Sequence, residues 1–105
     1  MKYKVIITPE AEADLRVAYR YIRKNAPQAA RAWIKSARIK IASLAIDPER
    51  AHYAPESVSF SLPIRELLYG SGNRGTYRIL FVILDRSVFV LNVRHGSMLG
   101  LEPEQ

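Results

Sequence analysis

The apolar positions in the first half of the chain predict a strand followed by two helices. Residues 1–8 are typical of a strand, and Thr8-Pro9 then supplies a helix N-cap and a first helical residue. Two apolar stripes at helical spacing follow, one through Leu15 and the other through Trp33. Because the break near Asn25 between the stripes is short, the two helices are expected to form an antiparallel hairpin.

The second half of the chain predicts strands that pair with their neighbours. Residues 49–63 contain two prolines and weak periodicity, which favours a loop with one short strand at Ser57–Leu62. A tight turn is expected at Asp85-Arg86, between two strongly apolar segments. The longer strands are expected at residues 64–70, 76–84 and 87–95.

This order of elements predicts an α+β fold in a single domain spanning residues 1–105. Its parts are a strand at 1–8, a helical hairpin at 9–46, antiparallel strands within 57–95 and a tail at 96–105. The last two strands are apolar on both faces, whereas two helices cover only one face of a small sheet. We therefore expect the tail, a partner chain or another copy of this chain to cover the second face.

Three cationic side chains interrupt the last two strands. With a two-residue turn, Arg78 lies opposite Val93, and His95 is diagonal to Arg78 on the same face. Arg94 then lies opposite Tyr77 on the other face. A one-residue shift in register exchanges these partners, so the pairing depends on the regularity of the hairpin.

A guanidinium group within an apolar sheet needs an anion or water to offset its desolvation. One interpretation of Arg78 is an ion pair with Glu66 or Asp85 at the margin of the sheet. The other is an anion-binding site on the uncovered face, with Arg78 as a planar donor and His95 as a group that titrates near neutral pH.

Net charge adds a second candidate surface. The chain carries a formal charge of +6, which favours an acidic or polyanionic partner. Arg16 and Arg20 recur on one face of the first helix, and Arg31, Lys35 and Arg38 recur on the second. These stripes are either a solvated surface or the docking site of an acidic partner. The full set of candidate binding residues is Arg16, Arg20, Arg31, Lys35, Arg38, Arg65, Arg78, Arg94 and His95.

The remaining chemistry is sparse. The chain has no cysteine and two histidines far apart in sequence, so we expect no disulfide, metal site or cofactor. Glu12 and Asp14 suit the start of a helix better than a catalytic carboxylate pair. No apolar run is long enough to span a membrane, and the first residues do not resemble a signal peptide. A cytoplasmic protein is expected.

Three segments resemble the RelE/ParE superfamily of toxins from bacterial type II toxin–antitoxin systems. They are TPEAEADLRVAYRYI near the start, RELLYG in the middle and YRILFVI with VFVLNVRHG near the end. The resemblance covers nearly the whole chain in the same order. It implies two helices on a curved sheet and plasmid stabilisation. It also implies a ParD-like or similar antitoxin that wraps the toxin and through which the complex contacts operator DNA.

The resemblance leaves the target of the toxin open. ParE-like members inhibit DNA gyrase by binding, whereas RelE-like members cut messenger RNA in the ribosome without a metal ion. Arg78 stands where the RelE-like pattern has its strand arginine, so an endoribonuclease would use Arg78 and His95. The RelE-like pattern continues with basic residues and a tyrosine, but residues 96–105 here contain neither. The chain therefore favours the ParE-like alternative. A third alternative is a module that has lost toxicity.

Overall fold

The computed structural model describes residues 2–60, 63–70 and 76–96. Within these ranges it contains four strands, three α-helices and two short 3₁₀ helices. The strands are β1 (Lys4–Ile7), β2 (Arg65–Tyr69), β3 (Tyr77–Leu84) and β4 (Ser87–His95). The α-helices are α1 (Pro9–Arg23), α2 (Pro27–Ala42) and α3 (Glu56–Phe60). The 3₁₀ helices are η1 (Ser43–Ala45) and η2 (Pro48–Arg50).

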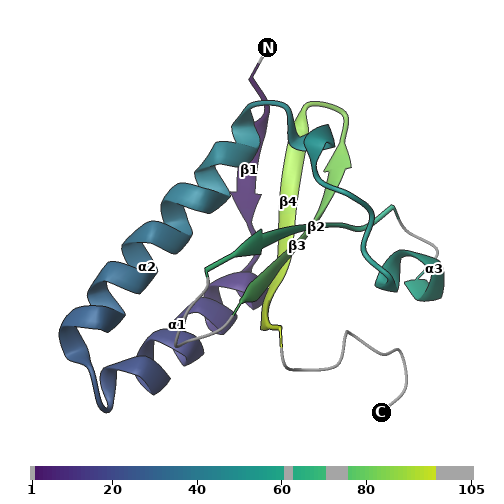
Figure 1. Cartoon of the computed structure of the whole chain (residues 1–105). Coiled ribbons are helices and arrows are strands. Elements are labelled where there is room, and N and C mark those ends of the chain that lie inside the picture. Colours follow the sequence, from purple (N-terminus) through teal and green to yellow (C-terminus); the bar gives the residue numbers. More distant parts are fainter. Residues whose placement is uncertain (1, 61–62, 71–75, 97–105) are drawn as a thin grey trace.

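The four strands form one open mixed sheet in the order β1-β4-β3-β2. β1 is parallel to β4, while β2, β3 and β4 are antiparallel to their neighbours. Helices α1 and α2 form a hairpin on one side of this sheet, and α3 lies on the other side (Figure 1). The α+β class predicted from the sequence is therefore confirmed, with the first strand at the edge of the sheet. None of the helices in the described ranges is both long and apolar enough to cross a membrane.

The helical hairpin begins where the sequence predicted. The side-chain oxygen of Thr8 accepts a hydrogen bond from the backbone N–H of Ala11, and Pro9 is the first residue of α1. The same hydroxyl group donates to the carbonyl of Val90 on β4. Thr8 therefore caps the helix and also fixes the start of α1 to the sheet.

The main core lies between the hairpin and one face of the sheet. Leu15 from α1, Ile41 from α2 and Phe81 from β3 are fully buried there. Burial of each such side chain contributes roughly 1.5–3 kcal/mol. Trp33 packs edge-on against the ring of Tyr77, with ring centroids 5.0 Å apart. The apolar periodicity of both helices therefore marks the face that packs on the sheet.

The expected strand at Ser57–Leu62 is wrong. Residues 56–60 form α3, and residues 61–62 lie outside the described ranges. A helix this short is not stable alone, so tertiary contacts must hold it. Ser57 accepts a hydrogen bond from the N–H of Ile64, and Glu56 binds Arg78 on the sheet. Local periodicity does not reveal these contacts, because they join residues that are distant along the chain.

The segment around α3 also covers part of the second face of the sheet. Ala54 and Ile64 pack against Leu80 and Val82 in a small cluster on the side of the sheet opposite the hairpin. The expectation that only the tail, a partner chain or another copy could cover this face is therefore wrong for its central part. The expected tail lies outside the described residues beyond Gly96.

The register of the β3–β4 hairpin is regular only near the turn. Leu84 pairs with Ser87 as predicted, but a bulge between Leu80 and Phe81 leaves Leu91 without a partner residue on β3. Beyond the bulge, every pair is displaced by one residue from the predicted pairing. Arg78 therefore lies opposite Arg94 instead of Val93, and Tyr77 lies opposite His95 instead of Arg94.

Candidate functional site

Arg78 is held by two acidic residues on the α3 side of the sheet. Its two terminal nitrogens donate to the carboxylate of Glu56 at 2.9 and 2.7 Å, and its Nε donates to Glu66 at 2.7 Å. The side chains of Arg78 and Glu56 are 13% and 3% exposed. The hydrogen bonds to Glu56 raise the pKa of Arg78 above its ordinary value. Of the two ion pairs suggested by the sequence, the one with Glu66 is confirmed.

Glu56 is the partner that the sequence did not reveal. It is 22 residues from Arg78 and lies in the segment expected to form a strand. It is also a buried charged residue, 4% exposed. The available signal in the sequence was an acidic residue directly after Pro55, an arrangement that suits the first turn of a helix. The bidentate geometry makes Arg78 a structural cation that joins α3 to the sheet.

His95 and Arg78 are not brought together. The ring of His95 packs edge-on against Tyr77, with centroids 4.9 Å apart, on the face that carries the helical hairpin. Arg78 leaves β3 on the other face. A catalytic pair of Arg78 and His95 around one phosphate would need both side chains on one face. The expected diagonal contact between them is therefore wrong.

Arg94 and Arg65 have contrasting surroundings. Arg65 donates to the carbonyls of Glu49 and Ala51, and its guanidinium carbon lies 4.3 Å from the centroid of the Tyr53 ring. It thereby fastens the segment before α3 to β2. The Nε of Arg94 is buried and has no hydrogen-bond partner, and no acid in the described ranges forms an ion pair with Arg94.

The basic stripes of the hairpin form the walls of a groove of about 490 Å³ between α1 and α2. Tyr19 and Ile34, both half-buried, form its apolar floor. Arg20, the remaining predicted residue on α1, is exposed but does not line the groove. The groove thus combines cations with apolar surface. The cations that line it are Arg16, Arg31, Lys35 and Arg38.

One groove cation is already neutralised within the chain. Arg38 donates to both carboxylate oxygens of Glu12 at 3.1 and 2.9 Å. This contact lowers the pKa of Glu12, to which the nearby charge of Arg16 also contributes. In the described part of the chain, Arg31 and Lys35 form no ion pair. Arg31 and Lys35 are therefore more available to an acidic partner than Arg38 is.

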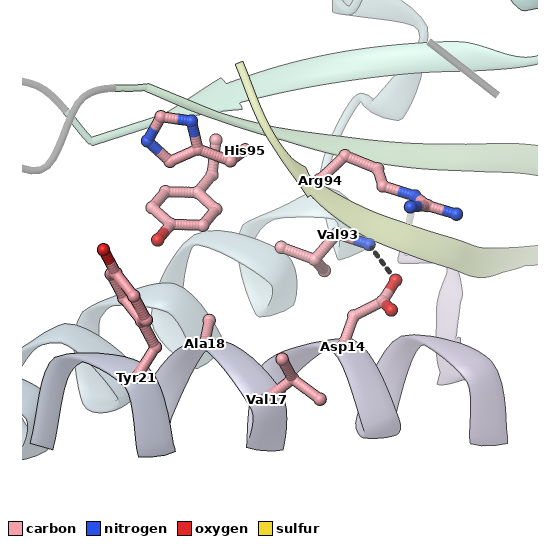
Figure 2. Close-up of a pocket in the computed structure, with 8 residues that line it drawn as sticks. Asp14, Val17, Ala18, Tyr21, Val93, Arg94 and His95 are labelled. Atoms are coloured by element: carbon pink, nitrogen blue, oxygen red, sulfur yellow. Dashed lines mark hydrogen bonds between the residues drawn. The ribbon is translucent and has the colours of Figure 1, made fainter. Parts of the chain in front are cut away.

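A second cavity, of about 440 Å³, lies where α1 meets the end of β4 (Figure 2). Val17, Ala18 and Tyr21 point toward it from α1, and β4 contributes Val93 and His95 (Figure 2). The sequence analysis did not identify this cavity. The signal was the placement of Val17 and Tyr21, two large apolar residues off the core stripe of α1 that are 59% and 74% exposed.

Asp14 lies at one end of this cavity and binds β4. One of its carboxylate oxygens accepts the backbone N–H of Val93 at 2.9 Å and the side-chain amide of Asn92 at 3.2 Å. Asp14 is therefore more than the surface acid expected from the sequence. Among the described residues, no group of three histidine, aspartate or glutamate side chains could hold a metal ion.

Comparisons with known proteins identify the family. The model of the family described as the ParE toxin of the type II toxin–antitoxin system parDE matches residues 5–100. A search of curated proteins found no match. The fold is similar to a chain of the chromosomal ParDE toxin–antitoxin system from P. aeruginosa, with a TM-score of 0.70 and 17% identity. That alignment covers 90% of this chain and 96% of the other.

The fold is also similar to a chain of the toxin–antitoxin complex RelBE2 from Mycobacterium tuberculosis. The TM-score is 0.53 at 24% identity, and the alignment covers 90% of this chain and 99% of the other. At these identities the two structures show a common fold, and the family model supplies the assignment. The chain therefore belongs to the ParE toxin family of type II toxin–antitoxin systems, within the RelE/ParE superfamily.

Proposed function

We propose that this toxin inhibits growth by binding DNA gyrase and does not itself cut RNA. Membership of the ParE toxin family supports this alternative over a ribosome-dependent endoribonuclease. The single observation that carries the proposal is the position of Arg78. Arg78, which stands where the RelE-like pattern has its strand arginine, is bound by Glu56 and Glu66, on the face opposite His95.

The chemistry of RNA cleavage explains why this observation supports the proposal. Cleavage without a metal ion requires cations that stabilise charge developing on the phosphate, and a group that accepts the proton of the attacking hydroxyl. Arg78 directs all three of its nitrogens to carboxylates, so a phosphate would have to compete with two acids. Binding to a target protein requires no such assembly.

The test compares two purified targets. We expect the purified toxin to inhibit DNA supercoiling by gyrase and to increase trapped gyrase–DNA cleavage complexes. We expect no cuts in messenger RNA on translating ribosomes at the same toxin concentration. Ribosome-positioned cuts with unaffected supercoiling would refute the proposal. Absence of any growth defect on induced expression would favour the alternative that the chain has lost toxicity.

We further propose that the α1–α2 groove receives a segment of the cognate antitoxin that wraps the toxin. A segment with acidic side chains along its edges and apolar residues at its centre would match the groove, because Arg31 and Lys35 border a floor of Tyr19 and Ile34. Such a segment would be disordered alone and fold on binding. Operator DNA would then be contacted through the antitoxin.

A further inference from the structure

The positive charge of the chain is concentrated in the helical hairpin. Residues 15–46 contain eight lysines and arginines and no acidic residue. The rest of the chain contains eight lysines and arginines together with all ten acidic residues, so its formal charge is −2. Charge gathered on one element in this way produces a local field that attracts an anionic partner, whereas a surface that serves solubility alone mixes both signs.

Three of these cations form a surface at the closed end of the hairpin, which we call the hairpin tip: Arg20, Arg23 and Lys24. Their spacing of three and four residues places them on one face of the helix. All three are exposed, and none of them forms an ion pair with a described residue. They do not line the α1–α2 groove. The closed end of the hairpin projects beyond the sheet (Figure 1), so a large partner can reach the tip.

The helix dipole accounts for only part of this charge. Arg20 and Arg23 lie in the last turn of α1, where cations are favoured. The first turn of α2 follows closely and favours acids, yet it contains none, and Arg31 lies just beyond it. Like charges four residues apart, such as Arg20 and Lys24, also repel each other by about 0.2–0.5 kcal/mol. The hairpin tip therefore carries more positive charge than its helices require.

The surroundings of the hairpin tip favour phosphate groups as its ligand. Asn25 and Gln28 are exposed polar residues that follow the tip and add amide donors. The large apolar residues exposed on α1, Val17 and Tyr21, line the cavity beside β4 instead. A protein partner or a lipid surface is held by apolar contacts in addition to charge. Phosphate oxygens need only the N–H donors of arginine, lysine and amide side chains.

We propose that the hairpin tip binds the phosphate backbone of duplex DNA directly, through Arg20, Arg23 and Lys24. Duplex DNA carries one negative charge per about 1.7 Å of its axis, so each of three cations gathered on one face can reach a phosphate. Contact of this kind does not depend on base sequence and adds to any contact made through the antitoxin. The choice of DNA over RNA rests on the proposed function, because gyrase acts on DNA.

The test measures binding of the purified toxin alone to a short fluorescent DNA duplex, by anisotropy at several salt concentrations. We expect a dissociation constant of about 1–100 µM at physiological salt, as is typical of nonspecific binding. Combining Arg20→Gln, Arg23→Gln and Lys24→Gln should weaken binding at least tenfold. The slope of log affinity against log salt should become shallower by about 2.7, because each phosphate contact contributes about 0.9. Since the assay contains no gyrase, failure of the gyrase proposal would leave this result unchanged.

The matched control removes the same charge elsewhere. Lys2→Gln, Lys4→Gln and Arg86→Gln alter the start of the chain and the turn beside β1. This end of the sheet lies far from the closed end of the hairpin (Figure 1). The control should change affinity less than threefold, and urea unfolding should show that both triple variants keep their stability. In the ¹⁵N-labelled original chain, DNA should shift the amides of residues 20–28 most.

Several results would overturn the proposal. Equal weakening in the two triple variants would show that net charge alone attracts DNA. Tighter binding of an RNA duplex of the same length would refute the choice of DNA. Tighter binding of polyglutamate than of DNA would make the hairpin tip a docking surface for an acidic protein. Binding of anionic vesicles without binding of DNA would make it a lipid contact. Absence of DNA binding at low salt and millimolar toxin would exclude a nucleic-acid ligand.

Discussion

Arg78 on β3 and the cations of the α1–α2 groove all carry positive charge in a basic protein, yet their surroundings are opposite. Arg78 is almost buried and directs every guanidinium nitrogen to a carboxylate. Arg31 and Lys35 are exposed, and in the described part of the chain they form no ion pair. The first cation holds the fold together, and the second pair is available to a partner.

The difference teaches how to separate structural from functional cations in a small sheet. A buried guanidinium group is costly without acids to pair with it, and where the fold supplies those acids, as at Arg78, little charge remains for a ligand. An exposed lysine or arginine needs no internal partner, since water solvates it. Arg94 falls between these cases, because it lies directly opposite Arg78 but lacks the acids that Arg78 has.

Removal of the Arg78 guanidinium should have the largest effect on stability. In Arg78→Met the carboxylates of Glu56 and Glu66 remain close together and largely buried without a cation. Breaking a buried ion pair in this way should lower the free energy of unfolding by about 3–5 kcal/mol. Because the stability of such domains is roughly 5–15 kcal/mol, much of it would be lost. Urea unfolding followed by the fluorescence of Trp33 measures the change.

Two further variants test the cause of that loss. Arg20→Met removes an exposed arginine from α1 and should change stability by less than about 0.5 kcal/mol. Arg78→Met combined with Glu56→Gln should regain part of the loss, since the unpaired buried charge has been removed. A loss below about 1 kcal/mol in Arg78→Met would show that the network does not hold α3 to the sheet.

Charge reversal in the groove should leave the fold intact and weaken the complex with the antitoxin. Arg31→Glu combined with Lys35→Glu should reduce affinity by about 10–100-fold and flatten its dependence on salt. Arg38 is left unchanged in this variant because it also binds Glu12. Titration calorimetry at two salt concentrations provides the measurement, and urea unfolding confirms that stability is retained.

The matched control reverses the same charge far from the groove. Lys2→Glu combined with Lys4→Glu alters two exposed lysines at the start of the chain. If this pair weakens the complex as much as the groove variant does, net charge alone explains binding, and the groove has no specific role.

The sequence predicted what local periodicity determines. Both helices, the cap at Thr8 and the basic stripe through Arg31 and Lys35 follow from spacing along one element. The predicted register of Arg78 was wrong because the bulge at Leu91 breaks the alternation, and the sequence carries no signal for this bulge. Glu56 and Asp14 were missed because their roles depend on contacts between segments 22 and 79 residues apart.

His52 should contribute less than Arg78, although it belongs to the same network. Its Nε2 lies 2.6 Å from Glu66, but its side chain is 62% exposed. His52→Ala should therefore lower the free energy of unfolding by no more than about 1 kcal/mol, because Glu66 keeps its bond to Arg78. Urea unfolding measures the change. A loss above about 2 kcal/mol would mean that His52 positions Glu66 for Arg78.

Loss of the exposed pair of Glu12 and Arg38 should have the smallest effect on the free energy of unfolding. The pH dependence of stability tests this contribution. Hydrogen bonding to Arg38 lowers the pKa of Glu12 below its ordinary value of 4.5, so the folded state favours the charged carboxylate. The stabilisation is therefore complete above the unfolded pKa and is lost as pH falls through the folded pKa. Because both side chains are substantially exposed, Glu12→Gln should cost about 0.5 kcal/mol at neutral pH.

Comparison of the two proteins across pH tests this contact. The difference in free energy of unfolding between the original chain and Glu12→Gln should disappear once Glu12 is protonated in both states. A direct NMR titration of the Glu12 carboxylate should show the lowered pKa, and Arg38→Gln should return it toward its ordinary value. A difference that persisted at low pH would mean that Glu12 acts through packing. Such a result would remove the electrostatic distinction between Arg38 and the groove cations Arg31 and Lys35.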